Sequence, residues 1–203
     1  MGRADSGEIA AEQRILEAAT LHLRRHGALP FSVSAVARDA GMTHANVYRY
    51  FPSKAALVEA VTATWLKPLE ADLRAVADGP DPAHDKLERI LLALHRAYRT
   101  KLDVDPHLFD MFADALANGD GVARKHRIRV QTEIQRILEE GIAGGAFGVG
   151  EPRRALALII DSTYRFLHPT ALGFDREVPA HALAARLERL IKVVLRSLAS
   201  GRL

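Results

Sequence analysis

The chain has 203 residues, and 48% of them are hydrophobic, which is enough apolar material for a substantial core. The absence of cysteine excludes disulfides, thiolate zinc sites and cysteine nucleophiles. The net charge of +3 is too small to indicate nucleic-acid binding by itself. No apolar run approaches the roughly 18 residues that span a bilayer, and the polar N-terminus lacks a signal-peptide core. We therefore expect a cytoplasmic protein with no membrane partner.

Hydrophobic residues recur at helical spacing along nearly the whole chain, which predicts an all-α fold of about nine helices. No stretch shows strand-like alternation, internal repetition or low complexity. The first helix is expected from about Glu8 to His26, because Gly27 is a natural helix stop. After two short helices described below, longer ones are expected at about residues 53–76, 83–102, 107–118, 121–141, 152–168 and 179–199.

Two prolines should modify this outline. Pro68 lies inside the helix of residues 53–76, where its ring and its missing N–H should kink or break the helix. Pro169 should end or bend the helix of residues 152–168.

The segment of residues 31–57, FSVSAVARDAGMTHANVYRYFPSKAAL, is the most informative part of the chain. It predicts a short helix, a tight turn at Gly41, a second short helix to about Tyr50, and an immediate restart of helix after Pro-Ser-Lys. Ser32 and Thr43 can cap the two short helices. This arrangement is typical of a DNA-binding helix-turn-helix.

These patterns predict an N-terminal three-helix helix-turn-helix domain, residues 1–54, followed by a helical body, residues 55–203. A DNA-reading domain on a helical body indicates a regulator rather than an enzyme. An enzyme built on a helical bundle would need a nucleophile with its base, or a repeated Glu-x-x-His metal set, and the sequence has neither. A helical adaptor that uses the helix-turn-helix for protein contacts is the remaining alternative.

The last two long helices are apolar on more than one side. In residues 179–199 one line of apolar residues is Leu183, Leu187, Leu190 and Val194, and a second is Ile191, Leu195 and Leu198. The ALALII run gives the preceding helix an apolar surface nearly all round. A helix with two apolar stripes is buried on two sides, so we expect a homodimer through these last two helices. The alternative is that both helices lie at the centre of a monomer.

Residues 14–61 resemble the tetracycline-repressor (TetR) family of transcription regulators. RILEAATLHLRRHG is similar to the opening helix of that family, SVSAVARDAG to its second helix, and MTHANVYRYFPSKAAL to its recognition helix. Beyond residue 61 only the helix order and the GIAGGAF stretch agree. The resemblance implies a dimeric regulator, most often a repressor, that binds a palindromic operator on double-stranded DNA and is released by a small, largely hydrophobic effector.

Residues of the helix-turn-helix divide by role. Between Ala40 and Val58 the chain carries two cations and no acid. The hydroxyls of Thr43, Tyr48 and Tyr50 and the ammonium of Lys54 suit phosphate contacts. The start of the recognition helix should enter the major groove, where Asn can pair with adenine, Arg with guanine, and Ala can touch a thymine methyl. The full expected DNA-binding set is Ser32, Thr43, His44, Ala45, Asn46, Tyr48, Arg49, Tyr50 and Lys54.

The family resemblance also implies an effector cavity among the fifth to eighth helices. Its candidate lining residues are apolar or aromatic with a few polar ends, although each could instead be plain core. They are His95, Tyr98, Phe109, Phe112, Tyr164 and His168, with Trp65 near the entrance to the body.

Other polar clusters are expected to have no specific function. The basic run from Arg124 to Arg129 is typical of a solvated helix face, and a second DNA contact is the alternative. His95, His107, His126 and His168 lie on different predicted helices, which disfavours a zinc site. We expect no metal and no cofactor.

Overall fold

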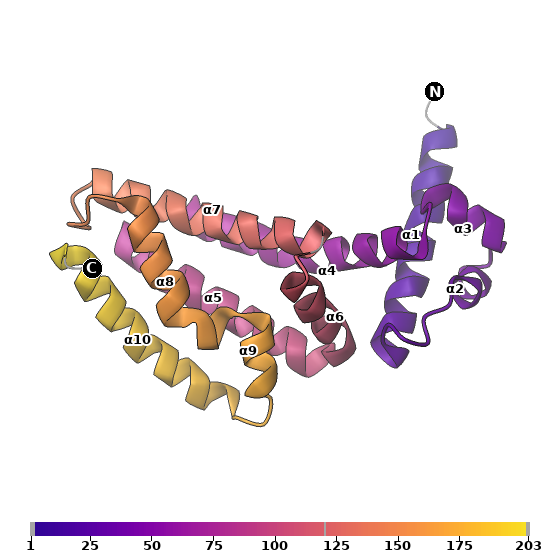
Figure 1. Cartoon of the computed structure of the whole chain (residues 1–203). Helices are drawn as coiled ribbons and strands as arrows, with labels where there is room; N and C mark the ends of the chain where they lie inside the picture. The colour runs from indigo at the N-terminus through magenta and orange to yellow at the C-terminus, as the bar shows by residue number, and fades with distance from the viewer. Residues whose placement is uncertain (1–2, 120, 202–203) are drawn as a thin grey trace.

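The computed structural model describes residues 3–119 and 121–201, and within them the chain forms only helices (Figure 1). The helices are α1 (Arg3–His26), α2 (Val33–Asp39), α3 (His44–Tyr50), α4 (Lys54–Ala77), α5 (Ala83–Val104), α6 (Pro106–Ala117), α7 (Gly121–Ala143), α8 (Pro152–Leu167), α9 (Pro169–Phe174) and α10 (Ala180–Ser200). The all-α prediction is confirmed. The six-residue α9 was not expected as a separate helix: Pro169 ends α8 and, at its first position, starts α9.

The three N-terminal helices pack around a small core of their own. Leu23 of α1, Val36 of α2 and Val47 of α3 are almost completely buried, and Phe51 closes the same core. The turn between α2 and α3 needs Gly41, whose φ of +67° lies in the left-handed region that favours glycine. The short helices are therefore held by capping, by this turn and by packing on α1.

Helix α4 leads from this head into the body without interruption (Figure 1). Of the two effects expected of Pro68, a kink or a break, the break was wrong. Pro68 and Thr64, whose carbonyl loses its usual N–H partner, are both exposed, so water can satisfy that carbonyl. The neighbouring face of α4 is buried through Trp65, Leu69 and Leu73, and this packing keeps the helix continuous.

The body surrounds α5. Helices α4 and α7 pack against each other and against α5, and α8 and α10 cover the remaining sides of α5 and pack together (Figure 1). Helix α6 lies between α1, α5, α7 and α9, so it touches both the head and the body. The core of the body is built from buried leucines and isoleucines of these helices together with Phe109 and Phe112 of α6.

The glycine-rich loop after α7 is shaped by two close approaches. A Cβ at Gly141 would lie 2.3 Å from the Phe147 ring, and one at Gly148 would lie 2.8 Å from the Ala199 carbonyl oxygen. The Gly148 N–H donates to the Leu198 carbonyl at 2.9 Å. These glycines therefore let the loop fold back on α7 and pack against the end of α10.

Helix α10 buries one stripe against its own chain, at Leu183, Leu187, Ile191, Val194 and Leu198. This grouping differs from the two expected lines, because the real stripe combines steps of three and four residues and takes members from both lines. Leu190 and Leu195 are only half-buried, and Val193 is 54% exposed. Helix α8 behaves in the same way, since Ile159 is buried whereas Leu156, Leu158 and Ile160 are half-buried. Part of the apolar surface of both helices therefore remains unpartnered within one chain.

Candidate nucleic-acid interface and body cavity

Helix α3 presents a nearly complete polar face to solvent. Val47 is its one buried residue, whereas the predicted base-reading residues all lie exposed: His44, Ala45, Asn46 and Arg49. Seven residues span about two turns, so a single buried anchor leaves the remainder of the helix free to enter a groove. The predicted readers are therefore brought together on one surface.

The two capping hydroxyls are already engaged with backbone. Thr43 Oγ1 accepts the N–H of Asn46 at 3.2 Å, and Ser32 Oγ accepts the N–H of Ala35 at 3.4 Å. A hydroxyl that accepts still carries its own proton, so both residues can also donate to a phosphate oxygen. Capping and phosphate contact are thus compatible roles for Thr43 and Ser32.

The longer polar side chains of the helix-turn-helix contact one another in pairs. The Arg49 guanidinium donates to the Tyr50 hydroxyl at 2.8 Å and lies over its ring, 4.9 Å from the centroid. The rings of His44 and Tyr48 meet edge to face at 4.8 Å. The Lys54 ammonium lies 5.5 Å from the Phe31 ring centroid. Of the predicted set only Tyr50 is half-buried, and the others are exposed.

The head is tied to the body by a polar cluster, the Asp105 junction, formed by Arg24, Trp65, Lys101 and Asp105. Asp105 lies between α5 and α6 and is buried; its carboxylate pairs with Arg24 of α1 at 2.8 Å and accepts the Trp65 indole N–H of α4 at 2.9 Å. Lys101 of α5 donates to the Trp65 carbonyl at 2.7 Å, and burial lowers the pKa of this ammonium although Asp105 opposes the shift. The junction therefore connects α1, α4 and the start of α6.

Sequence reasoning missed the Asp105 junction, although Trp65 was placed near the entrance to the body. The available signal was Asp105 directly before Pro106, a usual way to begin a helix. The partners Arg24 and Asp105 are 81 residues apart. No local pattern brings them together.

The body contains a mostly apolar cavity of about 100 Å³ between α5, α7 and α8. Tyr98, Tyr164 and His168 of the predicted effector set line it. Tyr164 and His168 stack with ring centroids 4.5 Å apart. His95, Phe109 and Phe112 do not line this cavity; they are buried core residues at most 1% exposed.

His95 instead supports the packing of α5 on α8. Its Nδ1 lies 2.9 Å from the Phe166 carbonyl oxygen, and its Nε2 is buried without a hydrogen-bond partner among the described residues. Burial lowers the pKa of His95, so the ring is held in its neutral form.

A buried chain of hydrogen bonds, the Tyr98–His126–Glu70 relay, leads from the cavity wall to α4. The Tyr98 hydroxyl lies 2.9 Å from His126 Nε2, and His126 Nδ1 lies 2.9 Å from Glu70 Oε1. A carboxylate only accepts, so Nδ1–H donates to Glu70, and the Tyr98 hydroxyl donates to Nε2. Burial raises the pKa of Tyr98 and lowers that of His126, the latter against the opposing effect of Glu70. The relay thus joins α5, α7 and α4.

The relay also corrects the interpretation of the basic run on α7. Arg124, Lys125, Arg127 and Arg129 are exposed as expected for a solvated face, whereas His126 is 1% exposed and belongs to the core. The helical period explains the difference, since His126 shares its face with the buried Ala123 and Val130.

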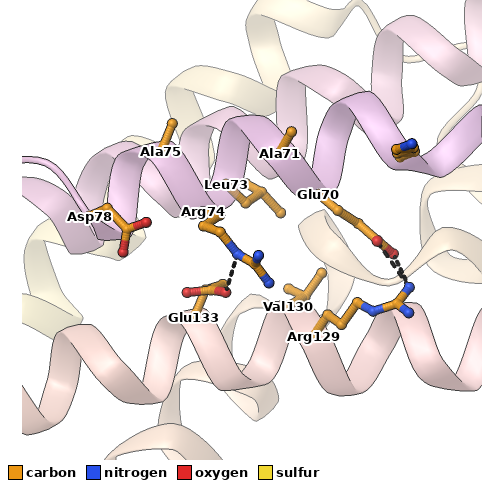
Figure 2. Close-up of a pocket in the computed structure, with 10 residues that line it drawn as sticks. Glu70, Ala71, Leu73, Arg74, Ala75, Asp78, Arg129, Val130 and Glu133 are labelled. Carbon is orange, nitrogen blue, oxygen red and sulfur yellow. Dashed lines mark hydrogen bonds and ion pairs between the residues drawn. The ribbon is translucent and has the colours of Figure 1, made fainter.

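A larger groove of about 410 Å³ runs along the surface between α4 and α7 (Figure 2). Its charged side chains face one another across the two helices: Arg74 meets Glu133 at 3.4 Å, and Arg129 meets Glu70 at 3.0 Å (Figure 2). Glu133, 8% exposed at its side chain, is also paired with Arg136. Since these charges satisfy one another, the groove is an ion-paired seam between helices, and the smaller apolar cavity is the better candidate for an effector.

Among the described side chains, those of residues 7–119 and 121–201, no group of three or more histidine, aspartate or glutamate side chains is placed to hold a metal ion. None of the described helices is long and apolar enough to cross a membrane.

Two family models match most of the chain. Residues 15–61 match the model described as "Bacterial regulatory proteins, tetR family", and residues 83–191 match "Tetracyclin repressor-like, C-terminal domain". The first covers α2, α3 and parts of the helices on either side, and the second extends from the start of α5 into α10. No curated protein matches the chain.

Solved structures of similar fold are also regulators. A TetR/AcrR-family transcriptional regulator from Thermobifida fusca YX-ER1 is 23% identical over 89% of this chain and 95% of its own, with a TM-score of 0.68. The fatty acid degradation regulator FadR from Bacillus halodurans is 20% identical over 89% of this chain and 93% of its own, with a TM-score of 0.65. The TetR-family regulator PfmR from Thermus thermophilus is 22% identical over 88% of this chain and 96% of its own, with a TM-score of 0.57. At such identities the likeness concerns the fold alone.

The helix-turn-helix with its exposed α3, the helical body and both matching models agree on one assignment. This chain belongs to the TetR family of DNA-binding transcription regulators.

Proposed function

We propose that this protein is a ligand-responsive repressor that binds a palindromic operator as a homodimer and is released by a small, largely hydrophobic effector. The observation that carries the proposal is the exposed face of α3 on a body with an apolar cavity. On this proposal residues 1–54 read DNA and residues 55–203 bind the effector and the second subunit. The protein acts in the cytoplasm, where it meets DNA, and has no catalytic role.

Two polar connections make the body suited to signal to the head. The Tyr98–His126–Glu70 relay begins at the cavity wall and ends on α4, and the Asp105 junction fastens α4 to α1. A dimer must hold its two recognition helices about 34 Å apart to fit successive major grooves. An effector that binds one arrangement of α4 more tightly than the other shifts this spacing, and a coupling of roughly 1–3 kcal/mol changes DNA affinity about 5- to 150-fold. This assigns the signal to packed polar contacts rather than to a break at Pro68.

The dimer is proposed to form through α8 and α10. The supporting observation is the apolar surface that one chain leaves uncovered, including Leu190 and Val193 of α10 and the half-buried leucines of α8. Two copies of one face pack together in an isologous interface, which places two α3 helices in the two-fold relation that a palindrome requires.

The DNA-contacting residues are expected to separate into two classes. Lys54→Ala should weaken binding to specific and random duplexes alike and reduce the salt slope of log K by about 1, because Lys54 is assigned to a phosphate. Asn46→Ala and Arg49→Ala should each lose roughly 1–3 kcal/mol of binding free energy at one base pair. Each variant should also discriminate less between bases at that position. Binding titrations at several salt concentrations measure both effects. Equal losses on operator and random DNA for all three variants would contradict these roles.

A gel-shift experiment with the DNA that flanks the protein's own gene tests the proposal directly. We expect one retarded complex with a palindromic segment, competed by the same segment and not by random duplex. A protein that shows no preference for any flanking segment, and instead captures a second protein through its N-terminal domain, would be the helical adaptor considered above.

A further inference from the structure

We infer that the body cavity binds a small amphipathic carboxylate, with its hydrocarbon chain inside and its carboxylate at the Arg127 side. The inference rests on the proposed ligand-responsive function and adds the chemical class of the ligand. It follows from the composition of the cavity wall and from an arginine that has no acid partner among the described residues.

The wall of the cavity is suited to a hydrocarbon chain. Half of the lining residues are aliphatic and come from α5, α7 and α8, with Leu116 from α6, and Pro169 adds a further apolar group. A chain placed here gains roughly 25 cal/mol for each Å² of apolar surface removed from water. The aliphatic members that define the wall are Leu94, Val130, Ile134, Ile159, Ile160 and Leu167.

The polar groups of the cavity carry positive charge or none. No aspartate or glutamate of the described residues lines it. The Tyr98 hydroxyl is engaged with His126, and the Thr163 hydroxyl donates to the Ile159 carbonyl at 2.6 Å. The donors left for a ligand are therefore Arg127, Gln131, Tyr164 and His168. This is the opposite of the α4–α7 groove, where acids and arginines pair with one another.

Arg127 is the uncompensated cation of this site. No acid lies within ion-pair distance of it among the described side chains of residues 7–119 and 121–201, whereas Arg129, two residues along the same helix, pairs with Glu70. His168 Nδ1 is buried without a hydrogen-bond partner among the described residues. Burial, assisted by the positive charge of Arg127, lowers the pKa of His168, so its ring stays neutral and can donate one N–H. A carboxylate at the edge of the cavity can accept from the Arg127 guanidinium, which supplies the partner that Arg127 lacks.

The size of the cavity selects the probe. At about 100 Å³ it is smaller than the roughly 300–1,000 Å³ of sites that hold drug-sized ligands, so a short chain is appropriate. Sodium hexanoate, hexan-1-ol and hexylammonium chloride have the same chain and differ in the charge of the head group. Isothermal titration of the full-length protein with each compound separates chain binding from head-group recognition.

We expect hexanoate to bind at least about tenfold more tightly than hexanol, and hexylammonium to bind most weakly, because a charge-assisted hydrogen bond to arginine adds to the burial of the chain. Arg127→Glu should reverse the order, so that hexylammonium binds more tightly than hexanoate. Arg124→Glu is the matched control: this exposed residue on the same helix does not line the cavity, and its replacement changes the net charge equally. In Arg124→Glu the order of affinities for the three compounds should remain that of the wild type.

Three results would overturn the inference: no hexanoate binding at millimolar concentration, hexanol or hexylammonium binding as tightly as hexanoate, or the same change in Arg124→Glu as in Arg127→Glu. Both replaced side chains are exposed, and thermal unfolding establishes that the variants fold. Adding each of the three compounds to the complex with operator DNA tests the class of the ligand separately from the repressor function. Release by a neutral or cationic ligand would refute the carboxylate class and leave the ligand-responsive repressor intact, whereas failure to bind any operator would refute the repressor itself.

Discussion

Replacing Leu190 and Val193 together with glutamate is expected to convert the protein into a folded monomer that has lost tight operator binding. Val193, 54% exposed, lies on the part of α10 that one chain leaves uncovered, and Leu190 is half-buried at the edge of that part. Neither belongs to the fully buried stripe of α10, so we expect the subunit to keep its fold. In an isologous interface each would bury an unpaired carboxylate, and the two-fold axis would double the number.

The effect on DNA binding should be larger than the loss of any single contact. Two linked heads benefit from a high effective concentration of the second head after the first has bound, which contributes about 10²–10⁴ to apparent affinity. Analytical ultracentrifugation gives the mass, and a titration of a palindromic duplex gives the affinity. Removing residues 179–203 altogether is a less direct test, because Leu183, Leu187 and Ile191 are fully buried in their own subunit and their loss would disturb its core.

Ala185→Glu provides the matched control. Ala185 is exposed on the same helix, five residues before Leu190 and so about 140° away around the axis. This variant should remain dimeric and bind DNA as the wild type does. If the double variant stayed dimeric, or if the control dissociated to the same extent, α10 would not form the interface through the Leu190–Val193 surface.

A second large effect is expected from acid. His95 and His126 are buried in their own subunit, and burial is the main cause of the lowered pKa of each. On acidification the unfolded chain takes up a proton at each of these histidines near pH 6.5, while the folded protein resists protonation. The unfolded state then binds more protons, so the free energy of unfolding rises with pH and stability is lost as pH falls below about 6.5.

The magnitude follows from the same linkage. Two histidines that stay neutral in the folded protein together lower the free energy of unfolding by up to about 2 kcal/mol as the pH falls from about 6.5 to 5.5. For a chain of this size, that loss corresponds to a decrease in Tm of about 4–8 °C. Thermal unfolding followed by circular dichroism at one fixed protein concentration measures it, because dimerisation makes Tm depend on concentration.

His126→Gln should remove about half of this decrease. The glutamine amide can donate to Glu70 and its carbonyl can accept from Tyr98, so the relay retains hydrogen bonds without a titrating ring. His181→Gln is the control, because His181 is exposed at the start of α10 and its ring stays in water in both states. A Tm that does not fall on acidification, or an equal response in both variants, would show that the buried histidines do not govern acid stability.

The local features of the reader could be predicted from sequence because they are set by nearby residues. Ser32 and Thr43 cap the helices that follow them, as expected, and Gly41 adopts the left-handed conformation that the turn requires. Val47 is the single buried residue of α3, because a two-turn helix with one apolar anchor has one way to pack. Helical periodicity and these caps establish the all-α class and the helix-turn-helix.

Helices α4 and α10 are two places where local sequence patterns did not predict the structure. A proline inside a helix disfavours that helix by itself, yet α4 continues because a neighbouring face is buried through Trp65, Leu69 and Leu73. In α10, spacing alone identifies excess apolar residues, but the neighbours α5 and α8 select Leu183, Leu187, Ile191, Val194 and Leu198 as the inner stripe. Tertiary packing therefore decided which residues are available to a partner.

What the amino-acid sequence determined by itself was the helical class, the position of the DNA reader and the exposure of its side chains, because capping, turns and amphipathic spacing act over a few residues. Only the tertiary structure decided which predicted effector residues line a cavity and which are core. It alone also placed Arg24 beside Asp105, and His126 between Tyr98 and Glu70. Those contacts join helices that are distant along the chain, and their geometry depends on the packing of the whole body, which no local pattern encodes.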